Sequence, residues 1–333
     1  MLSRLFLWTA FTASFLFLAA VTVFAQTTLL NVSYDVSREL YKDVNSAFVR
    51  YWQDKTGSTL EIRQSHGGSS KQALAVLNGL EADVLTMNQA PDIDLLAEHG
   101  MVDKDWRQKF PHDAAPYSTI SVFLVRKDNP KNIKDWNDLI RPGIEVVVPN
   151  AKLSGNGRYS YLAAWGYAKL TLGSDEAARD FVRKLFAGVP VFDGGGRGAT
   201  TTFTQRNVGD VLVTFENEAR LVATELGADR FDIVYPSVSI NAAAPVAINE
   251  TVVGKRNTRE LAEGYLNFLY SPEGQAIIAK HNLHPSDETV LKVNQVKFPP
   301  IKTFDAETLI GPWAEIRKTH FNDGGIYDQI TVK

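Results

Sequence analysis

The chain has 333 residues, enough for two domains, and its 44% hydrophobic and 22% charged residues are ordinary values for a globular protein. Its net charge is −3 and no basic stripe stands out, so nucleic acid is not expected as a partner. The absence of cysteine excludes disulfides, thiol catalysis and thiolate metal sites. The six histidines are scattered, without carboxylates at a metal-ligand spacing, so neither a metal nor another cofactor is expected.

The first 25 residues have the layout of a secretory signal peptide. A short segment ends in the basic Arg4, residues 5–24 are almost entirely apolar, and Ala25 provides a small residue before a polar stretch. The apolar run is long enough to serve as an uncleaved membrane anchor, although several hydroxyl residues dilute it. We expect cleavage after Ala25 and a mature protein that is soluble outside the cytoplasm.

The next part of the chain alternates strands with amphipathic helices, which is typical of a parallel α/β sheet. Strands are expected at residues 28–34, 60–63 and 83–87, with helices at 37–52 and 69–78. Ser69 is expected to cap the second helix. The pattern changes near Pro116, where a long β-prone run at residues 118–125 begins.

Alternation resumes after this run and gives way to a helical tail. Further strands are expected at residues 144–148, 190–193, 210–216, 232–236 and 243–249, and helices at 157–170, 174–186, 199–206 and 217–226. Ser174 is expected to cap the second of these helices. From residue 257 the chain is helical, with Ser271 as a cap and Pro272 at the first helical position. The run at 243–249 could return the chain to the first lobe.

This order of elements indicates an α/β protein of two lobes crossed by paired β segments. We assign residues 26–117 and 244–333 to lobe 1, with its helical C-terminal tail, and residues 118–243 to lobe 2. A ligand cleft is expected between the lobes, because sites in open α/β sheets lie beyond the carboxyl ends of the parallel strands.

Three glycine-containing loops each precede a predicted helix, at residues 64–72, 150–158 and 193–202. The open N–H groups and the positive dipole end of a helix N-terminus attract anions. Any one loop could be an ordinary cap or a tight turn, but four glycines within residues 194–198 favour a special backbone path. Three such loops indicate a site for a small oxyanion.

Two arginines, Arg158 and Arg197, stand next to these loops. Either could brace a loop through a carboxylate such as Asp35, and a cation in contact with the ligand is not required, because neutral donors at helix ends can hold a dehydrated anion. Asp35 cannot favour an anion at close range. We therefore expect Asp35 behind the loops, where its carboxylate accepts hydrogen bonds and fixes them.

Six stretches of the chain resemble the periplasmic sulfate- and thiosulfate-binding proteins of bacterial ABC importers. They are NVSYDVSREL at 31–40, QSHGGSSKQALA at 64–75, WNDL at 136–139, GRYSYLAAWG at 157–166, FDGGGRGATTTF at 192–203 and YSPEGQ at 270–275. The resemblance spans nearly the whole chain after the leader. It implies the type II periplasmic binding-protein fold, with the ligand in the interlobe cleft, and a periplasmic monomer that delivers the anion to a membrane permease.

The resemblance also implies which residues contact the anion. Carried over position by position, the contacts fall on Ser69, Ser154, Gly155, Asn156 and Gly196, and Asp35 matches the acid that orders the loops. Two positions depart from the sulfate-specific branch, which has glycine in place of Asn156 and tryptophan in place of Phe215. Both residues, with Ser70 and the threonines at 200–202, look like the thiosulfate-binding branch.

The phenylalanine has a physical rationale. It lacks the indole N–H that would donate to sulfate, and the outer sulfur of thiosulfate is larger and accepts hydrogen bonds poorly. An apolar ring at Phe215 would therefore suit thiosulfate better than sulfate.

Other functions stay open at this point. The same fold could bind phosphate, molybdate or a metal-bound anion, although the proton on phosphate calls for an acceptor and Asp35 is the only candidate. A secreted hydrolase using Ser65 or Ser69 with His66 is disfavoured because no G-x-S-x-G elbow is present. A scaffold or adhesin has no repeat to support it. We expect a binding protein and no enzymatic reaction.

Overall fold

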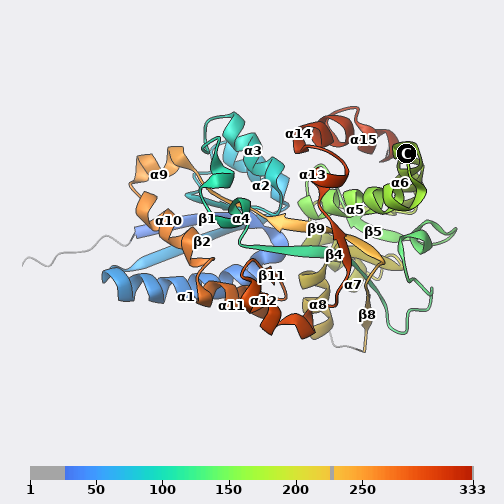
Figure 1. The fold of residues 1–333 in the computed structure, drawn as a ribbon, viewed down its shortest axis with the longest axis horizontal. Coiled ribbons are helices and arrows are strands. Elements are labelled where there is room, and N and C mark those ends of the chain that lie inside the picture. The colour runs from blue at the N-terminus through green and yellow to red at the C-terminus, as the bar shows by residue number, and fades with distance from the viewer. Residues whose placement is uncertain (1–26, 226–228, 332–333) are drawn as a thin grey trace, which may run out of the picture.

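The structure, a computed structural model, describes residues 27–225 and 229–331. The predicted signal peptide, residues 1–25, lies outside the described residues. The described chain forms two α/β units side by side, each around its own sheet (Figure 1). No helix in the described ranges is long and apolar enough to cross a membrane.

The first unit is built on a four-stranded sheet in the order β10-β3-β1-β2. Its parallel strands are β1 (Thr27–Tyr34), β2 (Leu60–Gly67) and β3 (Val84–Thr86), and β10 (Val246–Ile248) joins antiparallel to β3. The parallel strands are followed by the helices α1 (Arg38–Thr56), α2 (Ser69–Leu77) and α3 (Ala90–Glu98). The strand–helix alternation predicted for this segment is confirmed.

The second unit has the sheet order β12-β9-β4-β7-β5-β6. Its strands are β4 (Tyr117–Arg126), β5 (Val146–Pro149), β6 (Phe192–Asp193), β7 (Val211–Phe215), β9 (Val238–Ala244) and β12 (Lys302–Phe304), while β8 (Phe231–Val234) and β11 (His284–Pro285) pair with β4. Its helices are α5 (Gly155–Leu172), α6 (Asp175–Ala187), α7 (Gly196–Thr204) and α8 (Glu216–Glu225). β5 is parallel to both β6 and β7, so the chain again reaches helix starts at the carboxyl ends of parallel strands.

Two neighbouring strands, β4 and β9, carry the chain between the units. They pair antiparallel, with Tyr117 opposite Ala244, and β10 then enters the first sheet. We predicted one run at 243–249, whereas the structure has two strands separated by Pro245. Proline has no N–H to donate to a neighbouring strand, so Pro245 interrupts the strand. The alanines before Pro245 are not typical β-forming residues, so the sequence does not show that β9 extends to Ala244.

The C-terminal segment divides between the two units. It contains α9 (Glu250–Arg256), α10 (Arg259–Phe268), α11 (Pro272–Lys280), α12 (Glu288–Val293), α13 (Ala306–Leu309), α14 (Trp313–Ile316) and α15 (Ile326–Thr331). α10 packs on β10, whereas β12 pairs with β9 and α15 packs on α6. The ring of Tyr327 meets those of Tyr161 and Phe186 in the second unit. The segment that we assigned entirely to lobe 1 thus also contacts the second unit. β11 pairs with β4, and His284 meets Glu216 on α8. Beyond residue 301, β12 and α15 pack on β9 and α6, while α14 contacts α3 of the first unit.

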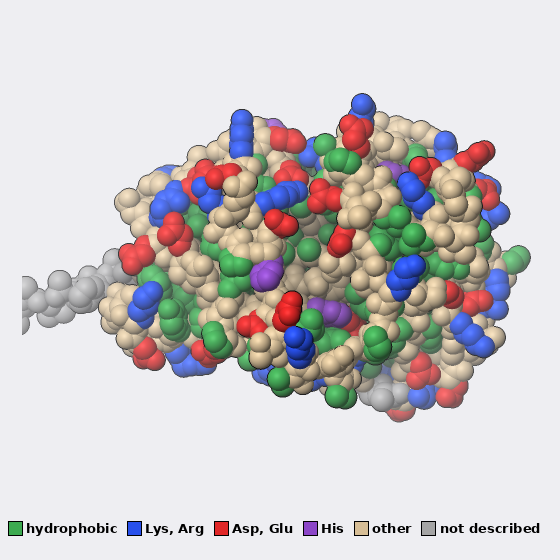
Figure 2. All heavy atoms as spheres, viewed as in Figure 1, with side chains coloured by type: hydrophobic (Ala, Val, Ile, Leu, Met, Phe, Trp, Pro, Cys, Tyr) green, Lys and Arg blue, Asp and Glu red, His purple; other side chains and the backbone are tan. Residues whose placement is uncertain are grey.

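Short elements complete the chain. They are the 3-10 turns η1 (Asp35–Ser37), η2 (Trp106–Gln108), η3 (Trp136–Ile140) and η4 (Gln295–Lys297), the short helix α4 (Pro111–Ala114) and the π-helical turn η5 (Arg317–Phe321). On the face shown in Figure 2, acidic and basic side chains are interspersed over both units.

Two predicted helix caps are confirmed and one is wrong. The hydroxyl oxygens of Ser174 and Ser271 accept hydrogen bonds from N–H groups in the first turn, each over 3.1 Å. Ser69, by contrast, is the first residue of α2, and Gly68 occupies the cap position. A Cβ at position 68 would overlap the carbonyl oxygen of Leu153 and lie 2.6 Å from that of Gly194, so only glycine fits there.

Candidate functional site

The helices α2, α5 and α7 begin where the two units meet. The N–H of Lys71 in α2 donates to the carbonyl oxygen of Leu153, just before α5, over 3.3 Å. Gly68 lies against both Leu153 and Gly194, the latter in the loop before α7. The structure therefore brings the three loops predicted from the sequence together, with two helix starts from the second unit facing one from the first.

The start of α2 offers backbone and hydroxyl donors. Ser69 is buried, and its Oγ accepts a hydrogen bond from the N–H of Asn88 over 3.4 Å. Lys71 and Gln72 use their N–H groups on Leu153 and Gly68. The N–H groups of Ser69 and Ser70 lie outside the hydrogen bonding of the helix, as the first N–H groups of any helix do.

The start of α5 is arranged in the same way. The Oγ of Ser154 accepts from the N–H of Gly157 over 3.4 Å, which leaves the N–H groups of Gly155 and Asn156 at the open end. The Asn156 side chain is engaged within the protein, because its Nδ2 donates to the Oγ1 of Thr214 over 3.2 Å. Asn156 would therefore meet a ligand through its backbone.

The start of α7 adds one more N–H group, that of Gly196. A Cβ at Gly196 would lie 2.9 Å from the Nδ2 of Asn156, so the starts of α5 and α7 are in contact. The next N–H, that of Arg197, donates to the carboxylate of Asp35 over 3.1 Å. Asp35 belongs to the first unit, and its hydrogen bond ties that unit to the loop before α7. Burial raises the pKa of Asp35, while the N–H and the charge of Arg197 oppose this.

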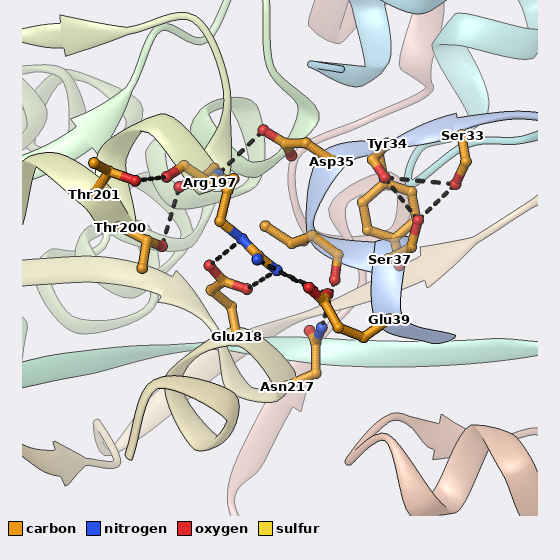
Figure 3. Close-up of polar contacts among 12 residues, drawn as sticks. Ser33, Tyr34, Asp35, Ser37, Glu39, Arg197, Thr200, Thr201, Asn217 and Glu218 are labelled. Carbon is orange, nitrogen blue, oxygen red and sulfur yellow. Dashed lines mark hydrogen bonds and ion pairs between the residues drawn. The ribbon is translucent and has the colours of Figure 1, made fainter. Parts of the chain in front are cut away.

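The side chains of both arginines pair with carboxylates, although Asp35 is not among them. Figure 3 shows the guanidinium of Arg197 between two other carboxylates. It donates to Glu39 on α1 over 3.0 and 2.8 Å, and to Glu218 on α8 over 3.1 Å. Its long side chain reaches past Asp35 to α1, so Arg197 connects the two units through its side chain as well as its backbone.

Arg158 also pairs with a carboxylate other than Asp35. Its guanidinium lies 3.7 Å from Asp92 of α3 and 5.0 Å from the ring centre of Phe321. Both arginines are thus neutralised by carboxylates. A ligand at the three helix starts would meet mainly neutral N–H and O–H donors.

Phe215 lies at the end of β7 and is fully buried. Its ring packs against that of Tyr159, with 6.0 Å between the ring centres, one turn beyond Asn156 on α5. The neighbouring Thr214 is the β7 residue whose side chain meets Asn156. Contact between Phe215 and a ligand stays a prediction.

Two asparagines at the site were missed by the sequence reasoning. Asn88 follows β3, and its side chain is in close contact with Gly155. A Cβ added at position 155 would overlap the Oδ1 of Asn88. Asn217, at the start of α8, donates to the carbonyl oxygen of Val36 over 3.2 Å and so also joins the units. The position of Asn88 directly after a predicted parallel strand was the one available signal.

The hydrolase alternative finds no geometric support. The hydroxyl of Ser65 pairs with the Gln72 side chain over 3.0 to 3.3 Å, and the Ser69 hydroxyl meets Asn88. Burial lowers the pKa of His66 to about 4. Within residues 27–225 and 229–331 no three His, Asp or Glu residues are grouped so that they could hold a metal ion.

The two α/β units and the three helix starts between them define a two-lobed protein of the type II ligand-binding class. The chain belongs to the family of bacterial extracellular solute-binding proteins, whose model matches residues 34–282. It is 54% identical to a thiosulfate-binding protein of Pseudomonas aeruginosa, over 91% of each chain. It is 52% identical to a sulfate-binding protein of Escherichia coli K12, over 95% of this chain and 97% of the relative.

Solved structures confirm the predicted fold class. The sulfate-binding protein SubI of Mycobacterium tuberculosis superposes with a TM-score of 0.81 at 31% identity, covering 89% of this chain and all of SubI. A periplasmic thiamin-binding protein reaches a TM-score of 0.70 at 16% identity and shares the fold alone.

Proposed function

We propose that this protein captures thiosulfate and sulfate outside the cytoplasm and delivers them to an ABC importer. The observation that carries the proposal is the meeting of three helix N-termini, from two units, around Ser69, Gly155 and Gly196. Open N–H groups at such termini suit a small dianion without a counter-ion. The names of the relatives, which are thiosulfate- and sulfate-binding proteins, support this choice of anion.

The anion contacts follow from the helix starts. We propose that Ser69 donates through its hydroxyl and its backbone N–H, and that Ser154 donates through its hydroxyl alone, because its own N–H donates to the carbonyl oxygen of Asn150. Gly155, Asn156 and Gly196 would donate through backbone N–H. Phe215 would provide an apolar wall, and Asp35 with Arg197 would fix the loops from behind. Since donors come from both units, a bound anion favours the arrangement in which the units are closed around it.

The remaining features of the proposal concern the whole protein. The leader, residues 1–25, would be cleaved on export to the periplasm, and the mature protein would act as a monomer that docks on a membrane permease. It would hold its ligand without transforming it. We propose that residues 26–117 and 244–333 form lobe 1 and residues 118–243 form lobe 2, with residues 302–331 also packing on lobe 2.

Calorimetric titration of the mature protein tests this function. The protein is unfolded, freed of bound anions and refolded, since a tight binder retains its ligand through purification. It is then titrated with thiosulfate, sulfate and phosphate. We expect tight binding of thiosulfate, with equal or weaker binding of sulfate, and little binding of phosphate, whose proton calls for an acceptor that faces the ligand. Binding of phosphate alone would favour the other-oxyanion alternative, and no binding of any would refute the proposal.

A further inference from the structure

One side chain at the helix starts has no explanation within the protein. Asn88 is 3% exposed, and its Oδ1 is buried without a hydrogen-bond partner. Its Nδ2 makes no hydrogen bond within the described residues, yet it is not among the fully buried atoms, so it keeps access to the space around it. Buried side-chain amides nearly always have partners, because losing water without a replacement is costly. The unpaired amino group of Asn88 therefore suggests an acceptor that is not part of the protein.

The position of Asn88 indicates what that partner is. Its backbone N–H donates to the Oγ of Ser69, at the start of α2. The Asn88 carboxamide packs against Gly155, at the start of α5. A Cβ added to Gly155 would overlap the Oδ1 of Asn88 and lie 2.7 Å from its Cγ. Asn88 therefore stands between donors of the two units, inside the group of helix starts.

The residue next to it shows that the local fold does not require this carboxamide. The amino group of Gln89 donates to the Oγ of Ser70 over 3.0 Å and to the Oδ2 of Asp92 over 2.7 Å. Gln89 thus holds the segment after β3 to α2 and α3. Asn88 is positioned by this neighbour and by its own backbone, so its side-chain amide is free for another role.

We propose that Asn88 is an additional anion-binding residue whose carboxamide amino group donates a hydrogen bond to the bound anion. The inference rests on the proposed function. The bound dianion gives Nδ2 a charged acceptor, which makes a stronger hydrogen bond than a neutral one. The Oδ1 faces the Cα–H of Gly155, a weak donor that an oxygen tolerates. The Asn88 amide is neutral, like the other N–H and O–H donors that we propose to contact the anion.

The test combines affinity and ligand-free stability in the mature protein. Asn88→Ala is compared with the wild type by calorimetry with thiosulfate and with sulfate, and by thermal unfolding without ligand. We expect the affinity to fall by about 10- to 100-fold, as for loss of one hydrogen bond to a charged group. The ligand-free Tm should stay the same or rise, because the variant removes an unsatisfied buried group. A merely structural residue would lower both quantities.

Two further variants sharpen the result. Asn88→Asp keeps the shape but replaces the donor by a carboxylate, so its affinity at pH 7.5 should fall further than that of Asn88→Ala. Gln275→Ala is the control, because the amino group of Gln275 donates to Pro116 and Leu269, away from the helix starts. It should lower the Tm and leave the affinity unchanged.

The outcomes separate this inference from the proposed function. Wild-type binding with an Asn88→Ala affinity within twofold overturns the role of Asn88 and leaves the function intact. A fall of both affinity and ligand-free Tm assigns Asn88 a structural role and also overturns the inference. Failure of the wild type to bind either anion overturns the proposed function itself.

Discussion

At the scale of single residues, the site depends on glycines that allow close approach and on polar groups that the protein leaves unpaired. Gly68 brings the loops of the two units into contact, and Gly155 accommodates the Asn88 side chain. Asn156, whose side chain is held by Thr214, instead fills the space between α5 and α7. The contribution of such residues to anion binding can be tested by single substitutions.

The first residue-scale prediction concerns Gly155. Gly155→Ala should weaken thiosulfate binding strongly, because the new methyl group collides with the Asn88 carboxamide and displaces the start of α5. Asn88→Ala removes the atoms in that collision, so the double variant should bind more tightly than Gly155→Ala alone. Calorimetry on the four proteins measures this coupling. Strictly additive losses would show that the two side chains do not meet.

A second prediction tests the specificity assigned to Phe215. Phe215→Trp should shift the ratio of thiosulfate to sulfate affinity towards sulfate, since an indole N–H adds a donor that sulfate uses better. The ring packs against Tyr159 in a full core, so the Tm of the variant must be measured beside both affinities. An unchanged ratio in a folded variant would refute the specificity argument.

At the scale of elements, the site is held together by contacts between helices of different units. Arg197 at the start of α7 reaches Glu39 on α1, and both side chains are about 30% exposed. The same arginine meets Glu218, which is buried at the start of α8. The contact with Glu39 joins the two units and exists only when they are close together, so it stabilises the closed arrangement. The contact with Glu218 lies within the second unit and does not depend on closure.

Glu39→Gln is therefore expected to weaken anion binding without changing any donor to the anion. Because the pair is partly exposed, the loss should be modest, roughly two- to fivefold in Kd and mainly in the dissociation rate. Asp43→Asn is a matched control, since Asp43 also lies on α1 but pairs with Lys280 and His281 within the first unit. Stopped-flow dissociation rates that are equal for both variants would contradict a closing role for Glu39.

Glu218 gives a pH-dependent prediction. Burial raises its pKa to about 7, although Arg197 opposes the shift. A raised carboxyl pKa means that the folded state holds the proton more tightly than the unfolded state. Stability therefore falls as the pH rises from about 4.5 to about 7, and the full effect is on the order of 3 kcal/mol.

Glu218→Gln removes this titration. Its stability relative to the wild type should rise between pH 5 and pH 8, as measured by urea unfolding at several pH values. The difference should grow up to about pH 7, where Glu218 ionises in the folded state, and stay nearly constant above that pH. A stability difference that stays constant with pH would show that Glu218 does not titrate there.

At the scale of the whole molecule, the two units are linked by the paired strands β4 and β9 and meet again at the helix starts. We predict that the ligand-free protein opens about these strands, and that thiosulfate reduces its radius of gyration as the units close. Small-angle scattering with and without ligand measures this change. An equal radius in both states would indicate that the units do not move.

Much of the fold could be predicted from the sequence because hydrophobic periodicity is local. The alternation around β1, α1 and β2 and the caps at Ser174 and Ser271 are confirmed by the structure. Helices α5 and α7 begin earlier than predicted, at Gly155 and Gly196, because glycine is a poor helix former and conceals a helix start. The division at Pro245 and the path of the tail were also missed.

The sequence by itself determined the α/β class and the three glycine loops, since each depends on residues close together in the chain. Only the tertiary structure decided which groups meet. It placed Arg197 against Glu39 and Glu218, attached the tail to the second unit, and left the Asn88 carboxamide unpaired beside Gly155. Such contacts join residues far apart in sequence, and burial and partners are properties of the folded chain that no local pattern encodes.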